Sequence, residues 1–142
     1  HLDMPLDAHV LKAPSGCTIY TSSHNPSKTQ ALQALGATVI ALPNAHGKVD
    51  LAAMLRDLGA RGTNELHVEA GFKLNGSLLR EGLVDELLLY LAPQLLGTGG
   101  MGLANFGPLD ELAQGVPLQW QDVSRIGNDL RIVARVAGRD QF

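Results

Sequence analysis

The first half of the chain alternates short apolar runs with stretches that have helical spacing. Cys17–Thr21 is an apolar run that predicts a buried strand. Residues 26–35 have the spacing of a helix, and Asn25 is the expected N-cap. The same order returns over residues 38–42, which are apolar and partly β-branched, and residues 51–58. Residues 51–58 predict a helix that Asp50 can cap and that has its large apolar side chains on one face. This half therefore predicts two strand–helix units.

The second half begins with a third strand–helix unit and ends with a hairpin. Residues 65–69 alternate in polarity as a strand does, and residues 71–81 have helical spacing. Three further runs have the pattern of strands, the first of them rich in leucine: residues 84–92, 118–125 and 129–136. The Gly127-Asn128 pair between the last two runs is a turn signal, so these two runs predict a β-hairpin.

This order of elements predicts an α/β fold. Strands that alternate with helices are joined by crossovers, and crossovers pair strands in parallel with helices on both faces of the sheet. The final hairpin adds an antiparallel edge. We therefore predict a three-layer sandwich with a largely parallel central sheet and a C-terminal antiparallel hairpin. No linker or repeat divides the sequence, so residues 1–142 are expected to form one domain.

Composition narrows the classes of function. Of the 142 residues, 45% are hydrophobic and 18% are charged, which is typical of a folded globular domain. The net charge is −3 and the basic residues are scattered, so nucleic acid is not an expected partner. Cys17 is the only cysteine, which excludes an internal disulfide and fits a reducing cytoplasm. No apolar run approaches the roughly 20 residues of a membrane span, and no membrane association is expected.

The most informative stretch joins the third strand to its helix. The strand ends at Glu69, Gly71 forms the turn, and the helix begins directly afterwards. Free backbone N–H groups and the positive end of the helix dipole bind phosphate at such a start, and a glycine leaves room for close approach. Glu69 has two interpretations that stay open: it accepts hydrogen bonds from ribose or amine groups of a ligand, or it caps the helix.

Three other motifs are weaker. Residues 97–102 have the letters of a G-x-G-x-x-G fingerprint but do not join a strand directly to a helix, so a surface loop is expected. His67 and Glu69 match the H-x-E half of a zinc deaminase signature, but the P-C-x-x-C half is missing and no metal site is predicted. The hydroxyls of residues 21–23 either hold a ligand or only shape the first strand-to-helix turn.

From residue 65 onward the sequence contains a series of motifs that occur in the same order in one family of bacterial enzymes. Residues 66–71, Leu-His-Val-Glu-Ala-Gly, resemble the V-E-[GA]-G strand end of that family. Residues 74–83 resemble its L-x-[GA]-x-[LF]-L-x-x-x-L helix. Residues 90–97 of this chain, Tyr-Leu-Ala-Pro-Gln-Leu-Leu-Gly, resemble the strand end that follows in the family, where position 94 is often basic. Residues 126–131 resemble its closing hairpin, and residues 2–13 its L-x-x-P-x-x-A-x-x-L segment. Over nearly its whole length the chain therefore resembles the reductase domain of the bacterial bifunctional riboflavin-biosynthesis deaminase-reductase.

The resemblance implies a dihydrofolate-reductase-like fold and NADPH-dependent reduction of 5-amino-6-(5-phosphoribosylamino)uracil to the ribitylamino product. It places Glu69 at the substrate. It places the cofactor at seven consecutive residues: Gly71, Phe72, Lys73, Leu74, Asn75, Gly76 and Ser77. It also implies a homodimer, an upstream zinc deaminase domain and a cytoplasmic enzyme, with no metal in this part.

By the same resemblance, residues 1–142 correspond to the C-terminal two-thirds of the reductase domain. The family's first strand and two substrate-binding loops would precede residue 1, so no catalytic residue is assigned. Two alternatives stay open: a related pyrimidine or pteridine reductase, and a non-catalytic nucleotide-binding or oligomerisation module.

Overall fold

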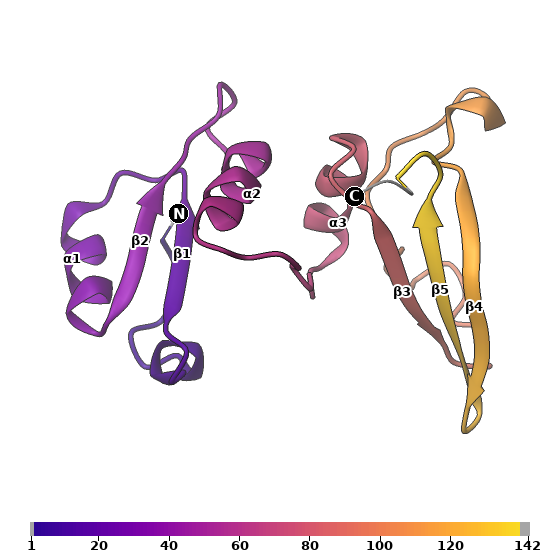
Figure 1. The fold of residues 1–142 in the computed structure, drawn as a ribbon, viewed down its shortest axis with the longest axis horizontal. Coiled ribbons are helices and arrows are strands. Elements are labelled where there is room, and N and C mark those ends of the chain that lie inside the picture. The colour runs from indigo at the N-terminus through magenta and orange to yellow at the C-terminus, as the bar shows by residue number, and fades with distance from the viewer. Residues whose placement is uncertain (1, 140–142) are drawn as a thin grey trace. The chain divides into compact units, whose positions relative to one another are not determined.

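The computed structural model describes residues 2–139, whose contacts separate into two compact units (Figure 1). Unit 1 comprises residues 1–66 and unit 2 residues 67–142. Within the described range no helix is both long and apolar enough to cross a membrane. The α/β class predicted from the sequence is confirmed, since unit 1 carries a parallel sheet and unit 2 an antiparallel sheet of three strands.

Unit 1 contains the two predicted strand–helix units. After a short 3-10 turn, η1 (His9–Lys12), the elements are β1 (Cys17–Thr21), α1 (Pro26–Ala34), β2 (Ala37–Ala41) and α2 (Leu51–Ala60). The two strands are parallel, with Cys17 opposite Ala37. Both helices begin where their caps predict, because Asn25 Oδ1 accepts from the Lys28 N–H at 3.1 Å and Asp50 Oδ1 from the Ala53 N–H at 2.8 Å.

The buried centre of unit 1 lies between α1 and the parallel pair. Leu32 is fully buried and packs with Leu2 and Ala37. Five partly buried side chains surround this cluster: Met4, Leu11, Cys17, Ile19 and Val39. Cys17 is thus a small packing residue of β1, in keeping with the apolar run in which it occurs.

Unit 2 contains α3 (Phe72–Arg80), β3 (Glu86–Leu91), a 3-10 turn η2 (Leu112–Gln114), β4 (Leu118–Ile126) and β5 (Asp129–Val136). The sheet order is β3-β5-β4, and both pairings are antiparallel (Figure 1). The predicted hairpin is confirmed: β4 and β5 are joined by two residues, and Ile126 lies opposite Asp129. Gly127 has a φ of 62° at the first turn position, as a type II′ turn requires.

The strand predicted over residues 65–69 is wrong, since these residues belong to no strand in the structure. They are exposed, and no described strand pairs with them. Alternating polarity shows only that a segment could present one face to a core. A β-strand forms only where a second segment pairs with it through backbone hydrogen bonds. The third unit also differs in its pairing, because β3 pairs with β5 antiparallel rather than in a parallel crossover.

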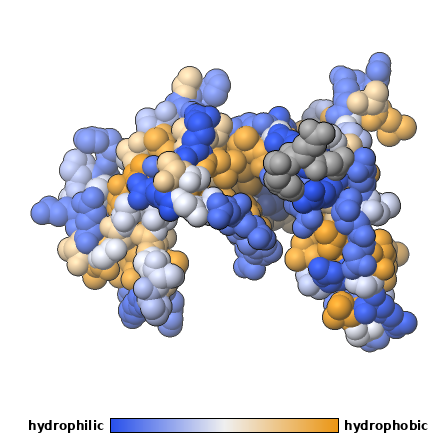
Figure 2. Space-filling model, in the orientation of Figure 1, coloured by the Kyte–Doolittle hydropathy of each residue, from blue (hydrophilic) through white to orange (hydrophobic). Residues whose placement is uncertain are grey.

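The antiparallel sheet of unit 2 has one apolar and one charged face. On the charged face Arg131 Nη1 lies 2.8 Å from Asp122 Oδ2, and Arg135 Nε lies 3.5 Å from Glu86 Oε2. The other face carries Ile132 and Ala134, which are buried, together with exposed Trp120. Apolar side chains also remain visible on the molecular surface in Figure 2.

Candidate functional site

The start of α3 has an uncapped and open N-terminus. Gly71 is the N-cap residue, and no side chain caps the helix. The Asn75 N–H makes the first intrahelical bond, to the Gly71 carbonyl at 3.1 Å, so the N–H groups of residues 72–74 have no acceptor within the helix. A Cβ added at Gly71 would meet no atom within 4 Å. The chain therefore leaves space for a ligand where the helix dipole is positive.

Glu69 lies two residues before this helix start and faces solvent. Its side chain is 88% exposed, and its Oε1 atom lies 3.6 Å from Nε2 of His67, which is also exposed. Glu69 does not cap α3, so the capping interpretation is not seen in the structure. Its carboxylate can still accept hydrogen bonds from a ligand, and that role stays a prediction.

Phe72, Asn75 and Gly76 share the face of α3 that contacts residues 102–105. The Asn105 N–H donates to the Phe72 carbonyl at 2.8 Å, and Asn75 Nδ2 donates to the Leu103 carbonyl at 3.0 Å. Gly76 is buried, and a Cβ there would stand 2.7 Å from the Asn105 nitrogen. Three of the seven residues predicted to bind a cofactor are therefore in contact with the loop at residues 102–105.

The other predicted residues of α3 have different surroundings. Ser77 Oγ donates to the Lys73 carbonyl at 3.2 Å and accepts from Arg80 Nη2 at 3.1 Å, so its hydroxyl is engaged within the helix. Lys73 and Leu74 are exposed. No ion pair within residues 2–139 involves the Lys73 ammonium, which remains available near the uncapped turn.

A second polar region lies in unit 1, where β1 and β2 end. A surface pocket of about 320 Å³ is lined mainly by polar side chains of the 21–25 turn and of α1, including Ser23, His24 and Gln33. Thr21 is buried, and its Oγ1 accepts from the Ser23 N–H at 3.0 Å. Thr21 thus shapes the turn, as one of its two interpretations states, while a ligand role for Ser22 and Ser23 stays a prediction.

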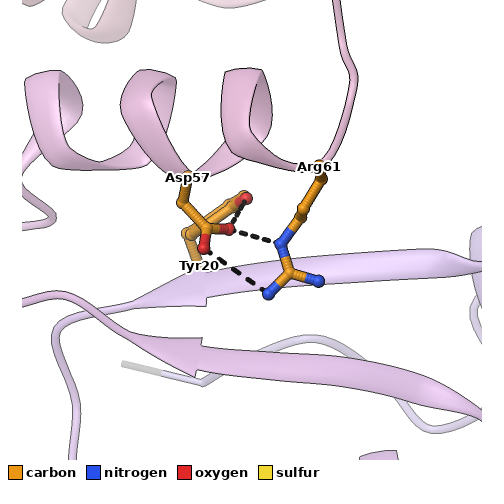
Figure 3. A network of polar contacts seen from close by, with 3 residues as sticks. All are labelled: Tyr20, Asp57 and Arg61. Atoms are coloured by element: carbon orange, nitrogen blue, oxygen red, sulfur yellow. Dashed lines mark hydrogen bonds and ion pairs between the residues drawn. The ribbon is translucent and has the colours of Figure 1, made fainter.

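A charged network that sequence reasoning did not single out ties α2 to β1 (Figure 3). Tyr20 donates its hydroxyl to Asp57 Oδ2 at 2.7 Å, and Arg61 Nε donates to the same oxygen at 2.6 Å. The Arg61 hydrogen bond, and then that of Tyr20, hold the pKa of Asp57 below its usual range. Burial and the bond to Asp57 raise the pKa of Tyr20. The Tyr20–Asp57 contact joins two elements that are far apart in the sequence, and no local pattern predicts it. The Asp57–Arg61 ion pair has i,i+4 spacing, which is a pattern that the sequence does show.

Two of the three weaker motifs remain to be located in the structure: the His67 and Glu69 pair and the glycine-rich run at residues 97–102. Across the described part of the chain no three histidine, cysteine or acidic residues gather as a metal site would require. Residues 97–102 form a loop that leads into no helix, as expected. The fingerprint geometry, in which a strand passes directly into a helix, is therefore not present at these glycines.

Comparisons of this chain with a family model and with known proteins agree on one family. The model of the RibD C-terminal domain matches residues 1–132. The riboflavin biosynthesis protein RibD of Escherichia coli is 38% identical over 89 residues, which are 63% of this chain and 24% of that protein. The 5-amino-6-(5-phosphoribosylamino)uracil reductase of Buchnera aphidicola is 30% identical over 61% of this chain and 42% of its own length.

A solved structure agrees with the sequence matches. Acinetobacter baumannii RibD superposes with a TM-score of 0.80 at 26% identity, covering 95% of this chain and 35% of that one. The chain thus spans well under half the length of these relatives.

The fold and the uncapped start of α3 define an α/β protein with a candidate phosphate-binding helix. The family match makes this more specific: the chain belongs to the RibD C-terminal domain family.

Proposed function

We propose that this chain is the larger part of an NADPH-dependent reductase domain acting on 5-amino-6-(5-phosphoribosylamino)uracil in riboflavin biosynthesis. The observation that carries the proposal is the start of α3, where the N–H groups of residues 72–74 are free and Gly71 leaves open space. A dinucleotide carries a pyrophosphate, and an open helix N-terminus is the backbone feature that binds one. The name of the Buchnera relative supplies the substrate.

The residues of this chain have distinct roles in the proposal. The backbone of residues 71–74 binds the cofactor pyrophosphate, and the ammonium of Lys73 adds a positive charge beside it. Glu69 accepts hydrogen bonds from the substrate. NADPH, when bound, supplies the hydride that reduces the ribosyl C1′ carbon. The protein's part in the reaction is orientation and electrostatic stabilisation, and no proton donor is assigned among residues 2–139.

The proposal extends to the surroundings of the domain. Relatives named RibD are much longer than this chain, in keeping with an upstream zinc deaminase domain in the same polypeptide. A homodimer in the cytoplasm is the assembly we propose. The scattered basic residues and the net charge of −3 give no support for a nucleic-acid partner.

Calorimetric titration with NADPH tests the proposed site. We expect Gly71→Asp to abolish binding, because its carboxylate would stand in the open space and repel the cofactor phosphates. Gly59→Asp is the matched control: Gly59 lies in α2, an added Cβ meets nothing within 4 Å, and the net charge changes equally. We expect this control to bind NADPH as the unchanged chain does.

A second measurement concerns Glu69 and the alternative functions. Glu69→Ala is expected to leave the affinity for NADPH unchanged, because the exposed Glu69 carboxylate contacts no part of the helix start. The same variant is expected to bind the phosphoribosylamino-pyrimidine substrate more weakly. Binding of both ligands without turnover would favour the nucleotide-binding module over the enzyme. If the folded chain fails to bind NADPH, the proposed cofactor site is wrong.

A further inference from the structure

A single side chain links the start of α3 to a loop that lies far along the sequence. Asn75 Nδ2 donates to the Ala70 carbonyl at 3.2 Å and to the Leu103 carbonyl at 3.0 Å. Ala70 precedes the helix, and Leu103 lies 28 residues beyond Asn75. Asn75 therefore bridges the turn into α3 and the 103–105 segment.

The backbone of Asn105 completes the attachment. Its N–H donates to the Phe72 carbonyl at 2.8 Å, and its carbonyl accepts from the Arg80 guanidinium. Gly76 permits this approach, because a Cβ there would stand 2.7 Å from the Asn105 nitrogen. The φ of Gly76 is not positive, so the glycine is needed for space and not for its backbone conformation.

The hydrogen-bond inventory of Asn75 argues against direct phosphate contact. A side-chain amide has two N–H donors, and the two bonds to Ala70 and Leu103 use both. Its remaining polar atom is a carbonyl oxygen, which accepts hydrogen bonds and repels an anion. Asn75 thus has no group left that would attract a cofactor phosphate.

The bonded carbonyls of Ala70 and Phe72 flank Gly71, the residue at the open helix start. Backbone N–H groups bind an anion well only when they are already oriented toward one point. We propose that the 103–105 segment, attached through Asn75 and seated on Gly76, fixes the first turn of α3 for phosphate binding. Asn75 and Gly76 are then positioning residues and not ligands. The inference rests on the proposed function, which supplies the cofactor.

The test is a double-mutant cycle on NADPH affinity. Asn75→Ala removes both bonds and is expected to raise the NADPH Kd by between about 2- and 10-fold, as loss of hydrogen bonds of ordinary strength would. The same change in a Gly71→Ala background, where a methyl group already obstructs the site, is expected to raise the Kd by less than about 2-fold, because coupled residues are not additive. Gly76→Ala, which displaces the 103–105 segment, is expected to raise the NADPH Kd as Asn75→Ala does.

Controls separate positioning from general loss of stability. Asn64→Ala changes an exposed asparagine of unit 1 and is expected to leave the Kd unchanged. All titrations are made well below the melting temperature of each variant, so that a purely structural role would leave the Kd unmoved. An unchanged Kd in Asn75→Ala, or an equal loss in both backgrounds, overturns the inference while the proposed function stands. Absence of NADPH binding by the unchanged chain overturns both.

Discussion

At the scale of single residues, we expect the carboxylate of Asp57 to make the stability of the fold depend on pH. Two donors, Arg61 first and then Tyr20, hold its pKa below the usual value of 3.8. A folded-state pKa that is lowered contributes stability above the unfolded value, and this contribution is lost as the pH falls through the folded value. We expect the free energy of unfolding to fall between about pH 5 and pH 3, and to fall less in Asp57→Asn.

Urea unfolding of both proteins at pH 5, 4 and 3 measures this difference. The other carboxylates are present in both chains, so their contribution cancels when the two pH profiles are subtracted. Parallel profiles would show that the Tyr20–Asp57–Arg61 contacts (Figure 3) add nothing to the pH dependence.

At the scale of elements, the β4–β5 hairpin depends on the left-handed conformation of Gly127. Its φ of 62° is one that an L side chain adopts only at a cost of about 1–2 kcal/mol. We expect Gly127→Ala to lower the free energy of unfolding by about that amount. Gly99→Ala is the control in the same unit, because Gly99 has no positive φ and an added Cβ meets nothing within 4 Å. An equal effect of the two substitutions would contradict the assigned turn.

The elements that the sequence predicts well are those with local signals. Asn25 and Asp50 cap the helices that they were expected to cap, and Gly127 closes the expected hairpin. The strand over residues 65–69 fails because alternation carries no information about the partner that a ladder needs. The open start of α3 is likewise local and predictable. The contact of Asn75 with Leu103 spans 28 residues and has no signal in the sequence.

At the scale of the whole molecule, the question is whether the two units unfold together. Only seven apolar residues of the described chain are buried, and they are divided between the units: Leu2, Leu32, Ala37, Leu51, Leu78, Ile132 and Ala134. A unit of about 70 residues with so small a core is marginal by itself. One family model also spans both units, from residue 1 to residue 132. We therefore predict that residues 1–142 unfold as one cooperative domain.

Leu32→Ala tests this prediction by native-state hydrogen exchange. Leu32 is fully buried in unit 1, and its truncation is expected to cost about 2–5 kcal/mol. In a cooperative domain the exchange free energy of the Ala134 amide, in the central strand of unit 2, falls by the same amount as that of Val39 in unit 1. A loss confined to Val39 would mean that each unit opens alone, and that the single-domain prediction is wrong.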